Sequence, residues 1–310
     1  MSITAVLIPC YNEDTAIAKV VADFRHALPD AKIYVYDNNS RDRTVEFARQ
    51  SGAIVRTEPL QGKGNVVRRM FADIEADIYV LVDGDATYDA ASAPRMIEAL
   101  CRDSLDMVNG ARVTEIEKAY RPGHRFGNWL LTSMVSWIFG SRFTDMLSGY
   151  RVMSRRYVKS FPALSAGFET ETELTVHALE LRMPTLEIDT PYKDRPEGSI
   201  SKLSTFKDGF RILWTILVLV KEERPMQFFS LCALLFAGIS TALIVPIIMG
   251  FLETGLVPRL PTAVLSMGMM IVAFLCLTCG LILDTVTRGR REMKRMRYLN
   301  IPGPQVGEEE

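Results

Sequence analysis

The sequence predicts an α/β fold, in which helices cover both faces of a mostly parallel sheet, followed by an interfacial segment and two transmembrane helices. Two observations support this prediction. In the N-terminal part of the 310-residue chain, short apolar runs alternate with segments of helical periodicity. Near the C-terminus, two long stretches contain no charged residue. The alternation is typical of a parallel sheet, because each crossover between parallel strands needs a connection about as long as a helix.

The alternation can be followed along the chain. The expected strands cover residues 3–8, 32–36, 53–56, 78–82, 107–111 and 186–191. The expected helices cover residues 13–28, 41–50, 65–74, 93–101, 126–139 and 167–181. We interpret three acidic residues of the last helix as a solvated helix start, favoured by the helix dipole. They are Glu169, Glu171 and Glu173.

Polar clusters follow three of the expected strands. The first strand leads into Pro9-Cys-Tyr-Asn-Glu13, the second into Asp37-Asn-Asn-Ser40 and the fourth into Asp83-Gly-Asp85. Open parallel sheets bind ligands at the carboxyl ends of their strands. We therefore expect the three clusters to line one crevice.

Asp83 and Asp85 predict a divalent-metal site. Side chains alternate along a strand, so positions i and i+2 project to one side. Hard cations such as Mg²⁺ bind one or two carboxylates and complete their shell with substrate phosphates. The pair therefore indicates that the site binds a diphosphate through the metal ion, although Asp-Gly-Asp triplets also occur in surface turns.

Residues 228–250 and 260–283 carry no charge, and each stretch is long enough to cross ~30 Å of hydrocarbon. Buried core helices are the alternative, but two such stretches joined by nine residues favour a transmembrane hairpin over residues 225–287. The preceding segment, residues 206–224, has an apolar core at 212–220 that is too short to span. This segment suits either an amphipathic helix in the membrane interface or a buried helix.

The charge distribution predicts an orientation. Six Lys or Arg residues lie between Arg288 and Arg297, whereas the link between the spans holds only Arg259. Basic flanks stay cytoplasmic, so we expect a multi-pass protein of the cytoplasmic (inner) membrane. The N-terminal domain (1–205), the basic tail (288–310) and both termini then face the cytoplasm.

Composition excludes some classes of function. The chain has 36 Lys and Arg against 37 Asp and Glu, so no general affinity for nucleic acid is expected. Its five cysteines are scattered, which indicates a reducing compartment without a disulfide framework.

Six motifs in sequence order resemble glycosyltransferase family 2, and within it the polyprenyl-phosphate glycosyltransferases typified by dolichol-phosphate mannose synthases. The resemblance covers residues 3 to about 210, and the C-terminal transmembrane hairpin matches one branch of that group. The motifs are Ile8-Pro-Cys-Tyr-Asn-Glu13, Asp37-Asn-Asn-Ser-Arg-Asp42, Gly62-Lys-Gly64, Asp83-Gly-Asp85, Asp145-Met-Leu-Ser-Gly-Tyr-Arg151 and Arg195-Pro-Glu-Gly-Ser-Ile-Ser-Lys202.

The resemblance implies a GT-A (Rossmann-like) fold, a nucleotide-sugar donor, Mg²⁺ or Mn²⁺, a polyprenyl phosphate acceptor and a membrane location. A homo-oligomer is left open. The residues it implies for the nucleotide sugar are Pro9, Tyr11, Asn12, Glu13, Asp37, Asn39, Lys63, Asp83, Gly84 and Asp85. The resemblance also implies Asp83 and Asp85 as metal ligands, and Asp85, Asp145 and Arg151 as catalytic residues. The residues expected at the phosphates of donor and acceptor are Arg112, Arg125, Arg151, Arg195, Ser199 and Lys202.

One position departs from the mannose-synthase pattern Asp-Ala-Asp-Leu-Gln, in which the Gln helps to bind the metal. Here Thr87 stands in the Gln position. This departure favours a UDP-linked hexose over GDP-mannose. A Gln-x-x-Arg-Trp string, typical of processive polymerases of the family, does not occur in the sequence.

The reaction expected is inverting transfer of the sugar to a lipid phosphate, which is already anionic at neutral pH and needs no general base. Asp145 is either an acid/base or positioning carboxylate, or a loop residue bonded to Ser148 or to backbone. Two other functions remain open. One is transfer to a hydroxyl acceptor, which would require a base, and the other is an inactive membrane scaffold with the same fold.

Overall fold

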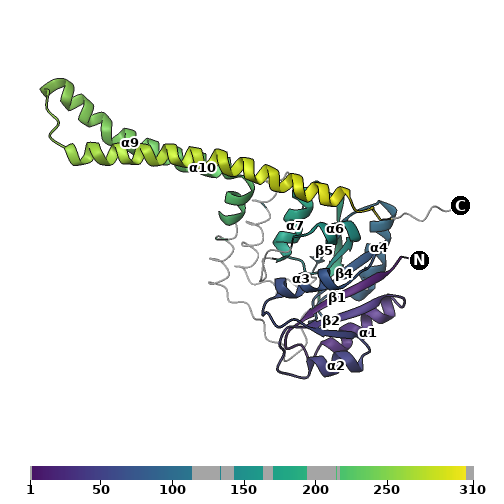
Figure 1. Cartoon of the computed structure of the whole chain (residues 1–310). Coiled ribbons are helices and arrows are strands. Elements are labelled where there is room, and N and C mark those ends of the chain that lie inside the picture. The colour runs from purple at the N-terminus through teal and green to yellow at the C-terminus, as the bar shows by residue number, and fades with distance from the viewer. Residues whose placement is uncertain are drawn as a thin grey trace. The chain divides into compact units, whose positions relative to one another are not determined.

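The computed structural model describes residues 2–113, 133, 143–162, 170–193, 214 and 217–304 (Figure 1). The chain forms two compact units. The first comprises residues 1–212 together with 294–310, and the second comprises residues 213–293.

A sheet of seven strands, in the order β3-β2-β1-β4-β6-β5-β7, organises the first unit. The strands are β1 (Thr4–Cys10), β2 (Lys32–Asp37), β3 (Ile54–Thr57), β4 (Ile78–Leu81), β5 (Met107–Val113), β6 (Arg151–Ser154) and β7 (Thr185–Pro191). All neighbouring pairs are parallel except those of β6, which runs antiparallel to β4 and β5. The expectation of a mostly parallel sheet is therefore confirmed.

The helices of this unit are α1 (Ile17–Ala27), α2 (Thr44–Gln50), α3 (Lys63–Asp73), α4 (Ala93–Arg102), α6 (Arg155–Ser160) and α7 (Thr170–Glu180), with a short 3₁₀ turn, η1 (Ala90–Ser92). β6 and α6 were not predicted from the sequence. Ser154 ends the strand and caps the helix, because its hydroxyl accepts a hydrogen bond from the Tyr157 N–H at 3.2 Å. The helix expected at 126–139 lies outside the described residues except for residue 133, as does most of the interfacial segment.

The central strands are apolar on both faces because both faces are covered. In β1, the consecutive residues Ala5 to Ile8 are at most 1% exposed. Val6 and Ile8 pack in the cluster that includes Phe24 of α1 and Met96 of α4. A parallel sheet buried on both sides needs such a continuous apolar run rather than an alternating one.

The opposite face is packed by aromatic rings. In β4, the Tyr79 ring lies 6.3 Å from that of Phe71 in α3. Phe71 in turn packs edge-on against Phe161, which follows α6, at 5.9 Å. Helices and their flanking residues therefore contribute side chains to both faces of the sheet.

The end of the chain is part of the first unit. The Tyr298 hydroxyl donates a hydrogen bond to the buried carboxylate of Asp106 at 2.8 Å. The Arg156 guanidinium lies 4.8 Å from the centre of the Tyr298 ring and also forms two hydrogen bonds to Asp106. Lys294 is paired with Glu180 of α7 at 2.6 Å. These contacts hold the segment 294–299 against the residue before β5, the start of α6 and the end of α7.

The second unit is built from α9 (Pro225–Thr254) and the part of α10 (Leu260–Leu299) that precedes residue 294. Both helices are long and apolar enough to cross a membrane by length and composition. Gly255, with φ of 68°, ends α9 in the left-handed conformation that favours glycine.

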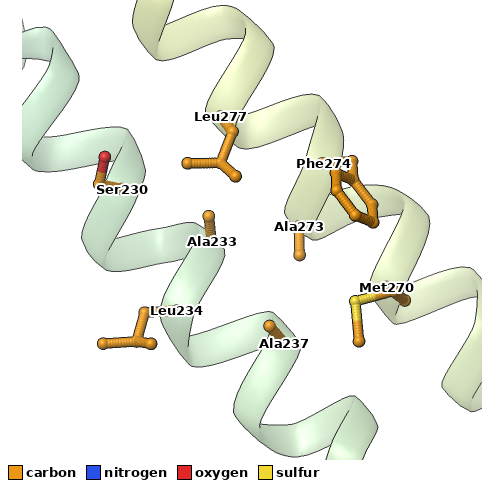
Figure 2. A pocket seen from close by; sticks show the side chains of 8 residues that line it. All are labelled: Ser230, Ala233, Leu234, Ala237, Met270, Ala273, Phe274 and Leu277. Carbon is orange, nitrogen blue, oxygen red and sulfur yellow. The ribbon is translucent and has the colours of Figure 1, made fainter.

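Small and hydroxyl residues line the contact between these two helices. The Ser240 hydroxyl donates to the Ser266 carbonyl at 2.7 Å, and the Ser266 hydroxyl donates to the Ser240 carbonyl at 3.0 Å. Interhelical bonds of this kind and closely approaching small residues are typical of packed membrane helices. Figure 2 shows an apolar pocket between α9 and α10, lined by Ser230, Ala233, Leu234, Ala237, Met270, Ala273, Phe274 and Leu277.

Tyr298→Phe removes one partly buried hydrogen bond to Asp106 and should lower the free energy of unfolding of the first unit by about 1 kcal/mol. Thermal unfolding of the full chain in neutral detergent measures this. Tyr34→Phe on β2 is the matched control, since the Tyr34 hydroxyl has no hydrogen-bond partner within the described part of the chain. Equal unfolding of both variants would show that the Tyr298 contact does not stabilise the docked segment.

Candidate active site

The carboxyl ends of β1, β2 and β4 lie side by side, because β1 pairs in parallel with both of the other strands. The Asn38 N–H donates to the carbonyl of Cys10 at 2.9 Å, which joins the ends of β1 and β2. Burial raises the pKa of the Cys10 thiol well above its usual value, and four nearby carboxylates raise it further. They are Glu13, Asp37, Asp83 and Asp85. The three polar clusters therefore do converge on one place, around Cys10.

The loops after β1 and β2 are locked to each other by hydrogen bonds. The Asn12 N–H donates to the Ser40 hydroxyl at 2.8 Å, and the Asn12 side-chain oxygen accepts from the Arg41 N–H at 2.8 Å. Asn12 and Asn39 have φ of 52° and 65°. Asn tolerates this left-handed conformation better than most residues, so both positions suit tight turns that expose their side chains.

Asn38 was not among the residues expected at the site, yet it shapes the loop before α3. It is 3% exposed, and its amide donates to the carbonyls of Glu58 and Leu60 at 2.8 Å each. Its side-chain oxygen accepts from the Gly62 N–H at 2.7 Å. Gly62 has φ of 130°, a conformation that requires glycine. Together these contacts set where α3, and with it Lys63, begins.

The Asp83-Gly-Asp85 turn lies one residue beyond the end of β4 and packs over Cys10. A Cβ atom at Gly84 would lie 2.5 Å from the Cys10 sulfur, so only glycine fits there. Asp85 is 4% exposed and accepts hydrogen bonds from the Thr87 hydroxyl at 2.6 Å and from the Thr87 N–H at 3.3 Å. Thr87, the residue that departs from the family pattern, therefore orients the Asp85 carboxylate.

Lys63 links this turn to α7. Its ammonium lies 2.5 Å from the Asp83 carboxylate and also forms an ion pair with Glu171. Burial alone would lower the pKa of Lys63, but the charges of Asp83 and Glu171 outweigh it and raise that pKa above its usual value. Glu171 is only 6% exposed. The interpretation of Glu171 as part of a solvated helix start was therefore wrong, because its carboxylate is buried as a counter-charge.

Arg151 is placed differently from the expectation that it contacts a phosphate. It is fully buried and donates to the backbone carbonyls of Ser148, Met146 and Glu171 at 3.2, 2.8 and 2.9 Å. With its donors engaged by these carbonyls, the guanidinium braces the 146–149 loop against the start of α7. The same loop brings Gly149 so close to Asp83 that a Cβ there would overlap the carboxylate.

Arg112 and Asp145 form a two-pronged ion pair at the end of β5. The Arg112 side chain donates to the two Asp145 oxygens at 2.6 and 2.8 Å, and Asp145 is 6% exposed. The Arg112 guanidinium also lies 5.6 Å from the centre of the Tyr192 ring. Ser148 instead donates to the carbonyl of Gly110, so the Asp145 side chain is held by Arg112 rather than by Ser148.

Most of the expected site residues that are described lie in or beside this region, at the ends of β1, β2, β4 and β5 and at the start of α3. Four residues expected at the phosphates fall outside the described residues. They are Arg125, Arg195, Ser199 and Lys202.

The donor set fits a divalent cation that arrives together with a diphosphate. Within the described part of the chain, no group of three His, Cys, Asp or Glu residues is arranged as a ready-made metal site. Asp83 and Asp85 offer two carboxylates at one strand end, and Mg²⁺-type cations complete such a set with substrate phosphates and water.

Comparison with known proteins agrees with this geometry. A sequence model described as Glycosyl transferase family 2 matches residues 5–160. The chain is 32% identical over 302 residues to Glycosyltransferase AglJ of Haloferax volcanii, covering 95% of this chain and 97% of that protein. It is 28% identical over 220 residues to the Dolichyl-phosphate hexose transferase of the same organism, covering 71% of this chain and 95% of that protein.

Among solved structures, glucosyl-3-phosphoglycerate synthase from Mycobacterium tuberculosis, in complex with Mn²⁺, uridine diphosphate and glucosyl-3-phosphoglycerate, superposes with a TM-score of 0.58. The superposition covers 71% of this chain and 79% of that chain at 20% sequence identity. Identity this low shows the shared GT-A fold alone, and the fold expected from the sequence is confirmed.

Arg112→Met should lower the free energy of unfolding by about 3 kcal/mol, because it leaves the buried Asp145 carboxylate without its charged partner. Arg102→Met is the control, since the pair of Arg102 with Asp103 is exposed and exposed pairs contribute about 1 kcal/mol or less. Adding Asp145→Asn to Arg112→Met should restore part of the loss, as followed by thermal unfolding in detergent. An Arg112→Met variant as stable as Arg102→Met would show that the buried pair is not structural.

Proposed function

Because the chain belongs to glycosyl transferase family 2, we propose that it transfers a hexose from a nucleotide-diphosphate sugar, UDP-linked, to the phosphate of a polyprenyl lipid. The observation that carries the donor half is the gathering of Asp37, Asp83, Asp85 and Lys63 at adjoining strand ends. Parallel α/β sheets bind nucleotides at this edge. The remaining donor-site residues of the proposal are Pro9, Tyr11, Asn12, Glu13, Asn39 and Gly84.

Asp85 and Asp83 are the residues that would hold Mg²⁺ or Mn²⁺. When bound with the nucleotide, the cation would supply positive charge to the leaving diphosphate. The chain's own contribution there is the Lys63 ammonium, which is kept charged by its two carboxylate partners. The Thr87 hydroxyl donates a hydrogen bond to the Asp85 carboxylate and so orients it.

The acceptor half of the proposal draws on three observations. α9 and α10 are long and apolar enough to span a membrane, in which a polyprenyl lipid resides. A relative covered over 95% of its length is named as a dolichyl-phosphate hexose transferase. Within the described residues near the site, Asp145 is held by Arg112, which suits an acceptor that requires no general base. A phosphate oxygen would attack C1 of the sugar, the bond from C1 to the diphosphate would break, and the nucleoside diphosphate would leave.

The residues proposed to hold the acceptor phosphate are Arg125, Arg195, Ser199 and Lys202. Two phosphate groups must approach each other in this reaction, and cationic and hydroxyl donors offset their repulsion. Arg151 is not part of this set, because its buried guanidinium donates hydrogen bonds to three backbone carbonyls. Arg112 remains in the set only as the partner that orients Asp145.

The direct test is a panel of radiolabelled UDP- and GDP-sugars incubated with membranes that contain the full chain and undecaprenyl phosphate, scored by lipid extraction. The proposal requires transfer of label from a UDP-hexose into the lipid fraction, dependent on the added lipid phosphate. Label that appears only in a glycolipid or polysaccharide with a hydroxyl acceptor would contradict it.

Asp85→Ala should lower the rate of metal-dependent transfer by roughly 100-fold or more while leaving the fold intact. Loss of a ligand to the cation at the leaving diphosphate costs about 3 kcal/mol or more of transition-state stabilisation, which is roughly 100-fold in rate. Asp23→Ala on α1 is the control, since the Asp23 side chain is exposed. The measurement is the initial rate at saturating Mn²⁺, and a rate for purified Asp85→Ala close to wild type would remove Asp85 from the mechanism.

The proposed sidedness places the first unit and both termini in the cytoplasm and the 251–259 link on the outer side. The reason is the basic cluster from Arg288 to Arg297. In cysteine-substituted variants labelled on intact cells with a membrane-impermeant maleimide, Thr254→Cys should react and Gln305→Cys should react only after lysis. The reverse pattern of labelling would overturn the orientation.

A further inference from the structure

Lys63, Asp83 and Glu171 form a charge cluster in which one ammonium is shared by two carboxylates. The three side chains are unequally accessible. The side chain of Asp83 is 30% exposed, whereas the side chains of Lys63 and Glu171 are 11% and 8% exposed. A ligand that approaches the end of β4 therefore meets Asp83 first, with Lys63 and Glu171 behind it.

The backbone of Glu171 is held by two side chains, and its side chain is buried. Its carbonyl accepts hydrogen bonds from Arg151 at 2.9 Å and from the Thr175 hydroxyl at 3.2 Å. Lys63, in contrast, reaches the cluster at the end of a flexible four-carbon chain. If the pairing changes, we expect the Lys63 ammonium to move and the Glu171 carboxylate to stay in place.

Glu171 has unused capacity to bind that ammonium. Its Oε1 is paired with Lys63, whereas its Oε2 is buried and has no hydrogen-bond partner among the residues that the structure describes. An ammonium has three donors. Glu171 can therefore accept a second hydrogen bond from Lys63 without any other rearrangement of α7.

The pairing of Lys63 with Asp83 opposes the binding of a metal cation at Asp83. A divalent cation at this carboxylate would lie close to the Lys63 ammonium, and like charges in a partly buried site repel strongly. An ammonium that has little access to water cannot simply lose its partner, because burial without a counter-charge is costly.

We infer that Glu171 is a positioning residue that makes Asp83 available to the divalent cation and the nucleotide diphosphate, by taking over Lys63 when they bind. This inference rests on the proposed function, because it assumes a metal–nucleotide complex at Asp83 and Asp85. Lys63 pairs with both carboxylates before binding. After binding, Lys63 pairs with Glu171 and faces the diphosphate, and the Asp83 carboxylate contacts the cation and the nucleotide.

The test uses the full chain in neutral detergent and measures binding rather than turnover. A fluorescent UDP or GDP, whichever the wild type binds, is held at fixed concentration while Mn²⁺ is titrated. In Glu171→Gln, Lys63 keeps Asp83 as its only charged partner in the cluster, so the Mn²⁺ concentration for half-maximal binding should rise roughly tenfold. Glu98→Gln on α4, an exposed residue, should leave it unchanged.

A second titration separates this role from general damage to the pocket. At saturating Mn²⁺, the nucleotide affinity of Glu171→Gln should match that of the wild type. If Glu171→Gln fails to fold, Glu171→Asp keeps the charge but shortens its reach, and should raise the Mn²⁺ requirement by roughly threefold.

If the folded Glu171→Gln variant needs the same Mn²⁺ concentration as the wild type for half-maximal binding, the inference is overturned. A nucleotide affinity that is still roughly tenfold weaker than wild type at saturating Mn²⁺ would also overturn it. A wild-type chain that binds neither nucleotide with Mn²⁺ would instead overturn the proposed function, and the inference with it.

Discussion

The candidate site depends on the parallel pairing of β1 with β2 on one side and with β4 on the other. Because all three strands end at the same edge, their following loops meet around Cys10, and carboxylates from segments far apart in sequence become neighbours. Gly84 makes this packing possible, since any side chain there would collide with the Cys10 sulfur. Negative charge concentrated at one edge needs compensation, which Lys63 at the start of α3 provides in part. In the function that we propose, a bound divalent cation would add positive charge at this edge.

A second layer of contacts holds that edge from behind. Arg151 is fully buried and ties the 146–149 loop to the start of α7 through backbone carbonyls. Gly149 lies directly against Asp83, and Glu171 at the start of α7 is paired with Lys63. The turn that follows β4 is therefore enclosed by α3, α7 and the loop before β6. In the enzyme we propose, this enclosure orients the carboxylates before any ligand arrives.

Much of the fold could be predicted from the sequence, because the first four strands are short apolar runs separated by amphipathic helices. β6 and α6 were missed, since a four-residue strand that leads directly into a six-residue helix shows neither period clearly. At the site, the three polar clusters were predicted because they follow the strands immediately. The burial of Glu171 was not, because it depends on a partner 108 residues away along the chain. Arg151 was misjudged for a related reason, since a basic residue in a motif does not reveal which side of the strand it faces.

The most direct test of this account is an experimental structure of the full chain with uridine diphosphate and Mn²⁺. We predict that the diphosphate lies at the carboxyl ends of β1, β2 and β4, with Mn²⁺ coordinated by the Asp83 and Asp85 carboxylates and by phosphate oxygens. A nucleotide bound at another edge of the sheet, or a metal coordinated by neither Asp83 nor Asp85, would contradict this prediction.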